Sequence, residues 1–485
     1  MEKPLSKLLK RDLAIDPKIS GVTADSRKVK PGYLFVALPG AKADGRAFIP
    51  AAVEAGAVAV LGPEDVEGLS VPVIKAMDLR RAYALAAAAF FAAQPPTVVA
   101  ITGTNGKTSV ATFCRQIFTA LGHKAASMGT LGVTIGGVGA GAEQLTPPGL
   151  TTPDAGDVAE MICTLARRGV THLAMEASSH GIDQRRLDGV KLAAAGFTNL
   201  TQDHLDYHGT MGVYRAAKLR LFEALLPRDG VAVLNADSEA FGAFAATARL
   251  AGQTLFTVGE EGNGLKLIER TLLPDGQRLK IGHQGKVYDV RLPLAGAFQA
   301  SNALIAAGLC IAAGEKVPRV LSALERLEGA SGRLQRVGAG PRGGEAYVDY
   351  AHTPDGLETV LEALRPHTRG KLIVVFGAGG DRDRGKRPLM GKIAAELADV
   401  AIVTDDNPRG EVPAAIRAAI LEAAPDALEI GDRRQAIEAA VSQLREGDVL
   451  VVAGKGHEQG QIVGSVVHPF DDVAEVAAAL GVRHG

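Results

Sequence analysis

Residues 100–109 constrain the fold of this chain more than any other stretch. They read AITGTNGKTS, in which an apolar run leads into a glycine-rich loop and a helical pattern begins at once. Glycines let backbone amides turn toward a phosphate group, and the N-terminus of the following helix adds partial positive charge. The stretch therefore predicts a strand, a phosphate-binding loop and a helix, which together indicate an α/β fold. A glycine turn that merely precedes a helix is the alternative.

The residues of this loop are predicted to bind the phosphates of a nucleotide and its Mg²⁺ ion. Lys107 can reach the β- and γ-phosphates of ATP, and the Thr108 hydroxyl can bind Mg²⁺. The loop is shorter than the common GxxxxGK[ST] pattern because Ile101 stands where its first glycine belongs. The candidate nucleotide-binding residues are Gly103, Thr104, Asn105, Gly106, Lys107, Thr108 and Ser109.

The composition excludes several classes of function. Hydrophobic residues make up 47% of the 485 residues and charged residues 22%, as in a folded globular protein. The formal net charge of −1 gives no global basic field, so we expect no nucleic-acid partner. No uninterrupted apolar stretch reaches membrane-spanning length, so we expect no membrane insertion. Three widely separated cysteines indicate a reduced compartment, so we expect a cytoplasmic protein. We also expect that it acts as a monomer.

The order of apolar runs and breaks predicts three α/β domains. Short β-like runs mix with alanine-rich helical segments as far as Pro95 and Pro96. Strand and helix patterns then alternate, which predicts a doubly wound, mostly parallel sheet. A glycine-rich stretch near Ser331 precedes a second alternating series. We expect a small N-terminal domain at 1–95, a central P-loop domain at 96–330 and a Rossmann-like domain at 331–485.

A polar cluster follows the apolar run at 400–403. The sequence VTDDNPRGE, residues 403–411, places carboxylates, an amide and an arginine where a predicted strand opens into a loop. Loops at the carboxyl ends of strands hold the ligand contacts of α/β enzymes. On this stretch alone, a solvated turn is the simpler interpretation, because Asn-Pro and Pro-Arg-Gly favour turns.

The shortened loop GTNGKT resembles that of the Mur ligase family and its folylpolyglutamate synthetase relatives. The other motifs of the family follow in order, namely MEASSHGIDQRR, NLTQDHLDYHGT, YRAAKLRLF, QASNALIA, GASGRLQ and VDYAHTPDGL. The resemblance covers essentially the whole chain. It implies an ATP-dependent, ADP-forming ligase that joins a carboxylate to an amine in peptidoglycan precursor synthesis.

The resemblance also implies a catalytic set that includes Lys107. Glu176, at the end of an apolar strand, matches a Mg²⁺ ligand that acts with Thr108, and oxygen ligands suit this cation. His204 matches the position that binds a second Mg²⁺, although a lone histidine in a loop is the plainer interpretation. Lys218 matches a lysine that CO₂ converts to a metal-bridging carbamate, a reaction that burial of the amine favours. For Lys218 the alternative is an ordinary solvated lysine.

Further family positions imply binding residues. The nucleotide contacts beyond the loop are Asn302, Arg333, Asp349 and His352. The segment DSRKVKPGYLFVALPGAKADGRAF resembles a UDP-sugar-binding domain, with matching positions Ser26, Ala41, Lys42 and Ala43. The implied contacts to a muramoyl peptide are Thr151, Thr152, Ser178, Gln184 and Arg186.

Within the family, the sequence resembles the ligases that add meso-diaminopimelate to UDP-N-acetylmuramoyl-L-alanyl-D-glutamate. These ligases carry DNPR, whereas lysine-adding members lack the arginine. The physical reason is that meso-diaminopimelate has one more carboxylate than lysine, which a guanidinium binds bidentately. The implied residues are Arg382, Asp406, Asn407, Pro408, Arg409, Gly454 and Glu458. The alternatives are L-lysine as substrate, glutamate addition to a folate, a small phosphotransferase and a non-catalytic nucleotide-gated binding protein.

Overall fold

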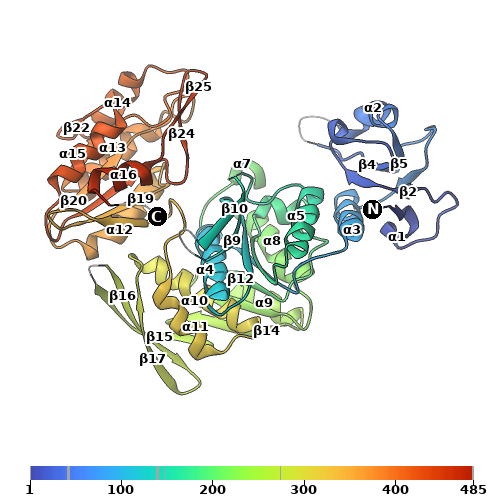
Figure 1. Cartoon of the computed structure of the whole chain (residues 1–485), viewed down its shortest axis with the longest axis horizontal. Helices are drawn as coiled ribbons and strands as arrows, with labels where there is room; N and C mark the ends of the chain where they lie inside the picture. Colours follow the sequence, from blue (N-terminus) through green and yellow to red (C-terminus); the bar gives the residue numbers. More distant parts are fainter. Residues whose placement is uncertain (1, 41–43, 138–140, 148, 274, 483–485) are drawn as a thin grey trace. The chain divides into compact units, whose positions relative to one another are not determined.

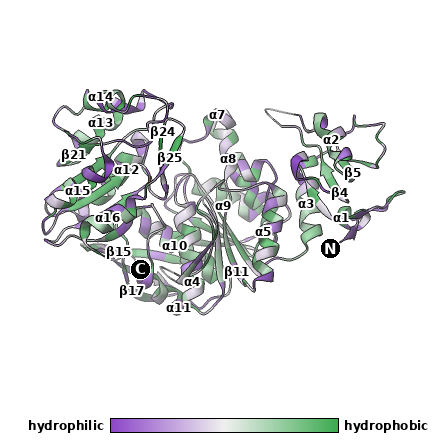
Figure 2. Cartoon of the chain, turned by 45° about the horizontal axis from the view of Figure 1, so that its top comes forward, coloured by the Kyte–Doolittle hydropathy of each residue, from purple (hydrophilic) through white to green (hydrophobic). Residues whose placement is uncertain are grey.

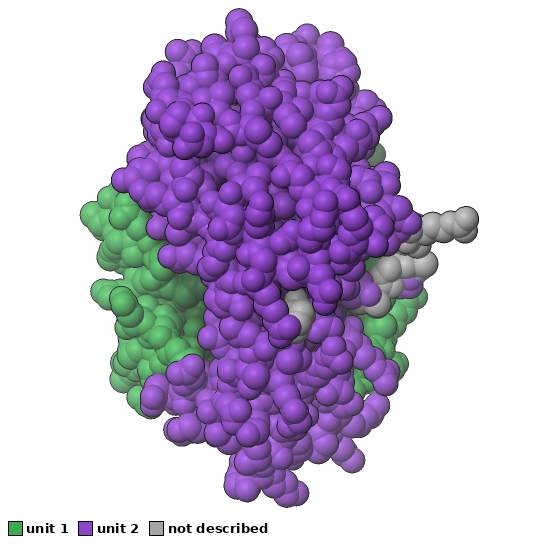
Figure 3. All heavy atoms as spheres, turned by 90° about the vertical axis from the view of Figure 1, so that its left-hand side faces the viewer, with its two compact units in different colours: residues 1–137, 142–257, 308–314 green, residues 138–141, 258–307, 315–485 purple. Residues whose placement is uncertain are grey.

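The structure is a computed structural model of the chain that describes residues 2–40, 44–137, 141–147, 149–273 and 275–482. The chain divides into two compact units, which Figure 3 shows in different colours. The first comprises residues 1–137, 142–257 and 308–314, and the second comprises residues 138–141, 258–307 and 315–485. Within the described residues, no helix combines the length and apolar character needed to cross a membrane.

The first unit begins with a small parallel sheet (Figure 1). Its strands, in spatial order, are β3 (Gly21–Thr23), β4 (Tyr33–Val36), β5 (Ala57–Gly62) and β6 (Val73–Lys75). The other elements here are β1 (Lys3–Pro4), β2 (Lys18–Ile19), α1 (Leu5–Leu9), α2 (Ile49–Glu54) and α3 (Leu79–Phe91). Tyr83 and Phe90 on α3 are buried in the same core as Leu34 and Leu61. The alanine-rich segment before the two prolines is therefore a packed helix.

A larger sheet of the first unit carries the phosphate loop. Its order is β10-β9-β8-β11-β7-β12-β13-β14, in which β9 and β10 are antiparallel additions to a parallel centre. The strands are β7 (Thr97–Thr102), β8 (Ala125–Gly129), β9 (Gly132–Gly136), β10 (Ala142–Thr146), β11 (His172–Glu176), β12 (Ala194–Phe197), β13 (Val231–Asn235) and β14 (Thr254–Gly259). The helices are α4 (Lys107–Ala120), α5 (Ala155–Arg167), α6 (Ser179–Asp183), α7 (Leu205–His208), α8 (Met211–Arg220) and α9 (Phe241–Leu250).

The position of β7 explains why the loop after it becomes a site. Parallel strands β11 and β12 lie on either side of β7, so the carboxyl ends of all three meet at one edge of the sheet. These central strands are buried and apolar, as the green colour of β11 in Figure 2 illustrates. Residues that follow Thr102, Glu176 and Phe197 are therefore brought together, which is where open α/β sheets bind ligands.

The second unit contains an antiparallel hairpin region and a second, largely parallel sheet. The end of β14 pairs with β15 (Leu265–Leu273), which continues into β16 (Gly276–His283) and β17 (Lys286–Leu292), and α10 (Ala297–Ala312) and α11 (Val317–Ala323) follow along the chain. The second sheet has the order β18-β19-β23-β20-β21-β22. Its strands are β18 (Gln335–Ala339), β19 (Glu345–Asp349), β20 (Leu372–Phe376), β21 (Val400–Val403), β22 (Leu428–Glu429) and β23 (Val449–Ala453).

Helices cover this second sheet, and a short hairpin follows it. The helices are α12 (Pro354–Leu364), α13 (Lys386–Leu397), α14 (Pro413–Leu421), α15 (Arg433–Gln443) and α16 (Asp472–Leu480), and the hairpin is β24 (Gly460–Val463) with β25 (Val466–Pro469). Strands β19, β23, β20 and β21 are parallel, so the loops after them share one edge. The predicted α/β class with mostly parallel sheets is confirmed. The three domain ranges, with borders near residues 95 and 331, stay a prediction.

Candidate functional site

The phosphate loop lies between β7 and α4, as predicted. Gly103 has a φ of +150°, and a Cβ built there would lie 1.8 Å from Thr198 Oγ1. Gly106, at the N-cap of α4, has a φ of +86°. Both positions require glycine, because a side chain would be strained or would clash. The Lys107 ammonium donates to the carbonyl oxygens of Gly103 and Thr104 at 2.9 and 2.8 Å, so it lies over the loop.

Residues after β12 hold the loop in place. The backbone N–H of Asn105 donates to Asn199 Oδ1 at 3.0 Å, and Thr198 Oγ1 donates to the Asn105 carbonyl at 2.6 Å. Thr104 Oγ1 lies 3.1 Å from the Tyr214 hydroxyl. The predicted loop residue Ser109 is buried in the first turn of α4. The loop is thus fixed by side chains that the sequence alone does not connect to it.

Thr108 and Glu176, the first two predicted metal ligands, are brought together. Thr108 Oγ1 donates to Glu176 Oε2 at 3.1 Å, and the backbone N–H of Thr130 donates to Oε1 at 2.8 Å. Glu176 is only 2% exposed, and a Cβ at Gly129 would lie 2.1 Å from its Oε1. A buried carboxylate needs hydrogen bonds or a cation as a partner. Hydroxyl and carboxylate oxygens are ligands that Mg²⁺ prefers. This pair fits Mg²⁺.

Lys218 is buried on α8, so the solvated-lysine alternative is wrong. The side chain is 1% exposed, its Nζ donates to the Gly103 carbonyl at 2.7 Å, and it lies 4.5 Å from the centre of the Tyr214 ring. Burial, with the nearby Lys107 charge, lowers the pKa of Lys218 well below its usual value, and the Asp203 charge opposes this shift. Folding therefore moves this amine toward its neutral form, which is the form that reacts with CO₂.

His204 belongs to a cluster of rings beside this lysine. Its ring centre lies 4.8 Å from that of His180 and 6.2 Å from that of Tyr214, and its Nε2 lies 3.3 Å from an Asp203 oxygen. The His180 ring also lies 5.5 Å from the His208 ring. Burial lowers the pKa of both His180 and His208. Both imidazoles are therefore biased toward the neutral form that accepts a proton.

The predicted muramoyl-peptide residues gather around the carboxyl end of β11. Ser178 donates to Thr152 Oγ1 from its hydroxyl at 3.0 Å and from its backbone at 3.2 Å. Arg186 donates to the Thr152 carbonyl and to Gln184 Oε1. Thr151 Oγ1 lies 2.9 Å from the hydroxyl of Thr130, which contacts the Glu176 carboxylate. The structure therefore links this group to the Glu176 carboxylate through the Thr130 hydroxyl.

The N-terminal residues of the predicted uridine site are only partly described. Ser26 lines a cavity of about 980 Å³ together with Lys28, Tyr33 and Asp154. Ala41, Lys42 and Ala43 lie outside the described residues. The cavity lining mixes hydroxyl, aromatic, cationic and acidic groups, and Lys28 forms an ion pair with Asp157 at 2.9 Å. The uridine role of Ser26 stays a prediction.

The second unit holds the other predicted nucleotide residues. The Arg333 guanidinium lies 4.9 Å from the Tyr350 ring centre, and the His352 ring lies 4.6 Å from that of Tyr350. Asp349 accepts two backbone N–H bonds of 2.6 and 2.7 Å, and burial raises the pKa of this carboxyl to about 6. Asn302 is buried and donates to the glutamine three residues before it at 3.2 Å. The role of Asp349 as a nucleotide contact stays a prediction, because in the structure its carboxylate binds backbone N–H groups.

The predicted diaminopimelate residues converge at the shared edge of the second sheet. Arg409, in the loop after β21, has a φ of +50° and donates to the Gly380 carbonyl at 3.0 Å. A Cβ at Gly379 would lie 2.7 Å from an Arg409 nitrogen, so this glycine makes room for the guanidinium. Arg382 lies in the same loop as Gly379 and is exposed. A non-glycine residue held at positive φ is a strained feature that is common at functional sites.

Buried polar groups form the base of this cluster. Asp406 and Asn407 are each 5% exposed, Pro408 is buried, and Asn407 donates to Glu458 Oε2 at 2.9 Å. Gly454 has a φ of +122°, and a Cβ there would lie 2.8 Å from Asp406 Oδ2. The solvated-turn interpretation is therefore wrong, because the DNP part of the motif is buried.

Two lysines beside these residues were missed by sequence reasoning. Lys455 is fully buried and contacts Asn407, and the Lys386 ammonium donates to the His352 carbonyl at 2.8 Å. Lys455 directly follows the predicted residue Gly454, and Lys386 lies four residues after the predicted Arg382. Only this closeness in sequence pointed to the two lysines, since burial of a lysine depends on contacts far along the chain.

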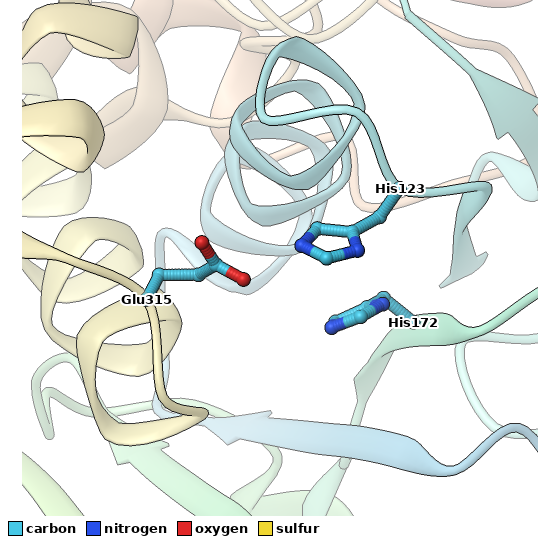
Figure 4. A group of neighbouring side chains, drawn as sticks. All are labelled: His123, His172 and Glu315. Atoms are coloured by element: carbon cyan, nitrogen blue, oxygen red, sulfur yellow. The ribbon is translucent and has the colours of Figure 1, made fainter.

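A pair of histidines in the first unit lies at the other end of the same elements. His123 follows the C-terminus of α4 and His172 begins β11, whereas the phosphate loop precedes α4 and Glu176 ends β11. The two rings are 3.9 Å apart at their centres (Figure 4). The Phe118 ring lies 4.5 Å from His172, so we interpret this pair as aromatic packing and not as part of the phosphate site.

Three domains of known protein families together match most of the chain. The family described as "Mur ligase family, catalytic domain" matches residues 18–91, "Mur ligase middle domain" matches residues 101–310, and "Mur ligase, glutamate ligase domain" matches residues 332–456. The matched segments therefore run through the phosphate loop, the buried lysine of α8 and the edge of the second sheet.

Similar proteins match along their full length. A UDP-N-acetylmuramoyl-L-alanyl-D-glutamate--2,6-diaminopimelate ligase of Caulobacter vibrioides is 73% identical over 481 residues, 99% of each chain. A protein of the same name from Bradyrhizobium diazoefficiens is 53% identical over 488 residues, again 99% of each chain. A solved structure with this ligase name has a TM-score of 0.76 and 33% identity, and it covers 99% of both chains.

Proposed function

The chain belongs to the Mur ligase family, and we propose that it adds meso-diaminopimelate to the D-glutamate γ-carboxylate of UDP-N-acetylmuramoyl-L-alanyl-D-glutamate. The reaction consumes ATP, releases ADP and phosphate, and forms an amide in a peptidoglycan precursor. The names of full-length relatives at 73% and 53% identity support this function. UDP-linked precursors and ATP are cytoplasmic metabolites, which supports a cytoplasmic location.

The geometry around Arg409 is the observation that favours meso-diaminopimelate over L-lysine as the amino acid that is added. The Arg409 guanidinium donates to the Gly380 carbonyl at 3.0 Å and lies 3.5 Å from the Asn407 carbonyl. Asn407 and its neighbour Asp406 are buried, and the Asn407 amide binds the partly exposed Glu458. Diaminopimelate ends in a carboxylate and an ammonium, which a guanidinium and an acidic group can bind together. L-lysine ends in an ammonium alone, so its cationic tail would be repelled by the arginine.

The first unit supplies the groups for activation of the carboxylate. Lys107 lies over the phosphate loop and is placed to stabilise charge on the γ-phosphate as the γ-carboxylate attacks it. Thr108 and Glu176 would hold Mg²⁺, with His204 and carbamylated Lys218 as further ligands. Bound Mg²⁺ would reduce the repulsion between the carboxylate and the triphosphate. The product of this step is an acyl phosphate.

The second step joins the amine to the activated carbonyl. The diaminopimelate amine attacks the acyl phosphate, and phosphate leaves from the tetrahedral intermediate. The loops that carry Arg409 and Glu458 would orient the amine by binding the far end of the molecule. The amine must lose a proton, and the neutral bias of His180 and His208 makes both candidates for accepting it.

The test is to measure ADP, phosphate and product together. Purified protein with ATP, Mg²⁺, the UDP-linked dipeptide and meso-diaminopimelate should form equal amounts of ADP, phosphate and an amide of the expected mass. Omission of any one substrate should stop the repeated turnover that forms all three. A stable phosphorylated product that accumulates over many turnovers without an amine would indicate a phosphotransferase, and nucleotide binding without turnover would indicate a binding protein. Either result would contradict the proposed function.

A further inference from the structure

Lys455 lies at the centre of the residues predicted to bind the amino-acid substrate. It follows β23 and is 0% exposed, although lysine is almost never fully buried unless it is paired. Its Nζ donates to Asn407 Oδ1 at 2.9 Å and to the Gly460 carbonyl at 2.7 Å. The same nitrogen lies 3.6 Å from an Asp406 oxygen and 3.5 Å from a Glu458 oxygen. The ammonium therefore touches three of the predicted substrate residues.

The ammonium helps to determine which way the Asn407 amide points. An ammonium only donates hydrogen bonds, so it must face the oxygen of the amide. The backbone N–H of Ile462 donates to the same oxygen at 2.9 Å. The amide nitrogen of Asn407 is consequently turned toward Glu458, whose Oε2 accepts its hydrogen bond at 2.9 Å. The Glu458 side chain is 34% exposed, so a carboxylate fixed from the buried side remains accessible to a ligand.

Hydrogen bonds to the β24 hairpin hold the backbone of the loop that carries Arg409. The Arg409 N–H donates to the Ile462 carbonyl at 3.0 Å, and the Gly464 N–H donates to the Arg409 carbonyl at 2.7 Å. Lys455 binds the first residue of β24, Gly460, and also Asn407, so it connects this strand to the loop after β21. A strained φ of +50° at Arg409 persists only when surrounding contacts hold it.

We propose that Lys455 is a positioning residue for the amino-acid substrate. It orients Glu458 through Asn407 and holds the loop of Arg409 against β24, so that the acidic and basic groups for the far end of the substrate stand at a fixed spacing. This inference rests on the proposed function, because it takes meso-diaminopimelate as the ligand. It assigns to Lys455 no contact with substrate or nucleotide.

The test is the kinetics of Lys455→Met, which removes the charge with little change in volume. The KM for meso-diaminopimelate should rise about 10- to 100-fold, while kcat and the KM for ATP and for the UDP-linked dipeptide stay within about twofold. The preference for meso-diaminopimelate over L-lysine should fall by a similar factor. Lys392→Met, at an exposed lysine of α13 in the same unit, is the matched control and should behave as the parent.

A second variant covers the case in which Lys455→Met does not fold. Asn407→Asp keeps an acceptor for the Lys455 ammonium but replaces the N–H donor that faces Glu458 with an oxygen, so the same rise in KM is expected. If the parent releases no phosphate with meso-diaminopimelate, the proposed function fails, and this inference fails with it. If the parent is active but folded variants show an unchanged or lower KM, or all three KM values rise together, the inference alone is overturned.

Discussion

Lys218 shows that the burial of a single side chain can depend on residues far away in the sequence. Its sequence context, RAAKLRLF, is that of an ordinary surface helix, and only the contacts with Gly103 and Tyr214 show that the amine is buried. These partners lie in other parts of the chain, so burial of Lys218 could not be predicted from local pattern. Lys455 is a second example, because its partners Asn407 and Gly460 belong to two different loops.

The predicted carbamate on Lys218 has a direct spectroscopic test. In buffer with ¹³C-bicarbonate, the ¹³C NMR spectrum of the parent should contain a protein-bound carbamate signal that Lys218→Met lacks. Because the variant also loses a predicted metal ligand, its kcat should fall by roughly 100-fold or more. Identical spectra for the two proteins would contradict the carbamate, and full activity in the variant would contradict a catalytic role for Lys218.

The phosphate loop is the element that sequence reasoning described most completely. Strand, loop and helix stand at the predicted residues, because glycine positions and helix periodicity are local signals. The same holds for the strand that ends at Glu176 and for the strand at 400–403 that precedes Asp406. The contacts that fix the loop, such as Asn199 with Asn105, were not predicted, because they depend on which strands become neighbours in the sheet.

Gly103→Ala tests the loop as an element. The added Cβ would meet Thr198 Oγ1 at 1.8 Å, and an alanine at this φ is strained by about 1–3 kcal/mol. We expect the variant to lose ATP binding, measured by titration calorimetry, and to melt at a lower temperature. Gly242→Ala on α9 is the control, because nothing lies within 4 Å of its Cβ and alanine favours a helix. Parent-like ATP affinity in Gly103→Ala would contradict the role of this glycine.

Glu411 lies two residues after Arg409 and connects their loop to the loop after β20, and its titration gives the second unit a predictable dependence on pH. Its carboxylate accepts hydrogen bonds from Arg387 and from the Asp381 backbone, which lower its pKa from 4.5 to about 2. Because the folded protein favours the charged form, this stabilisation is complete above pH 4.5 and is lost as the pH falls toward 2.

Glu411→Gln should therefore unfold at a lower urea concentration than the parent at pH 7. The gap between the two midpoints should narrow as the pH falls below 4.5, as followed by circular dichroism. Glu396→Gln, at an exposed glutamate of α13, is the control and should differ little from the parent at either pH. A gap that is absent at pH 7, or that widens on acidification, would contradict this account.

At the scale of the whole molecule, the chain combines a predicted nucleotide site with a predicted amino-acid site. The first unit holds the phosphate loop and the predicted metal ligands, and the second holds the loops around Arg409. The order of α/β segments predicted that the two larger sheets are mostly parallel, because their parallel strands are apolar runs bounded by glycine or polar residues. The antiparallel strands β15 to β17 were not anticipated, since their many exposed residues give weak burial signals.

The central claim is that Arg409 selects the amino acid that this ligase adds. The most direct measurement is the ratio of kcat/KM for meso-diaminopimelate to that for L-lysine, in the parent and in Arg409→Met. The control is Arg434→Met, at an exposed arginine of the same unit. We predict a parent ratio of roughly 100 or more that the control keeps and that Arg409→Met loses. Equal use of both amino acids by the parent, or full preference in Arg409→Met, would contradict the claim.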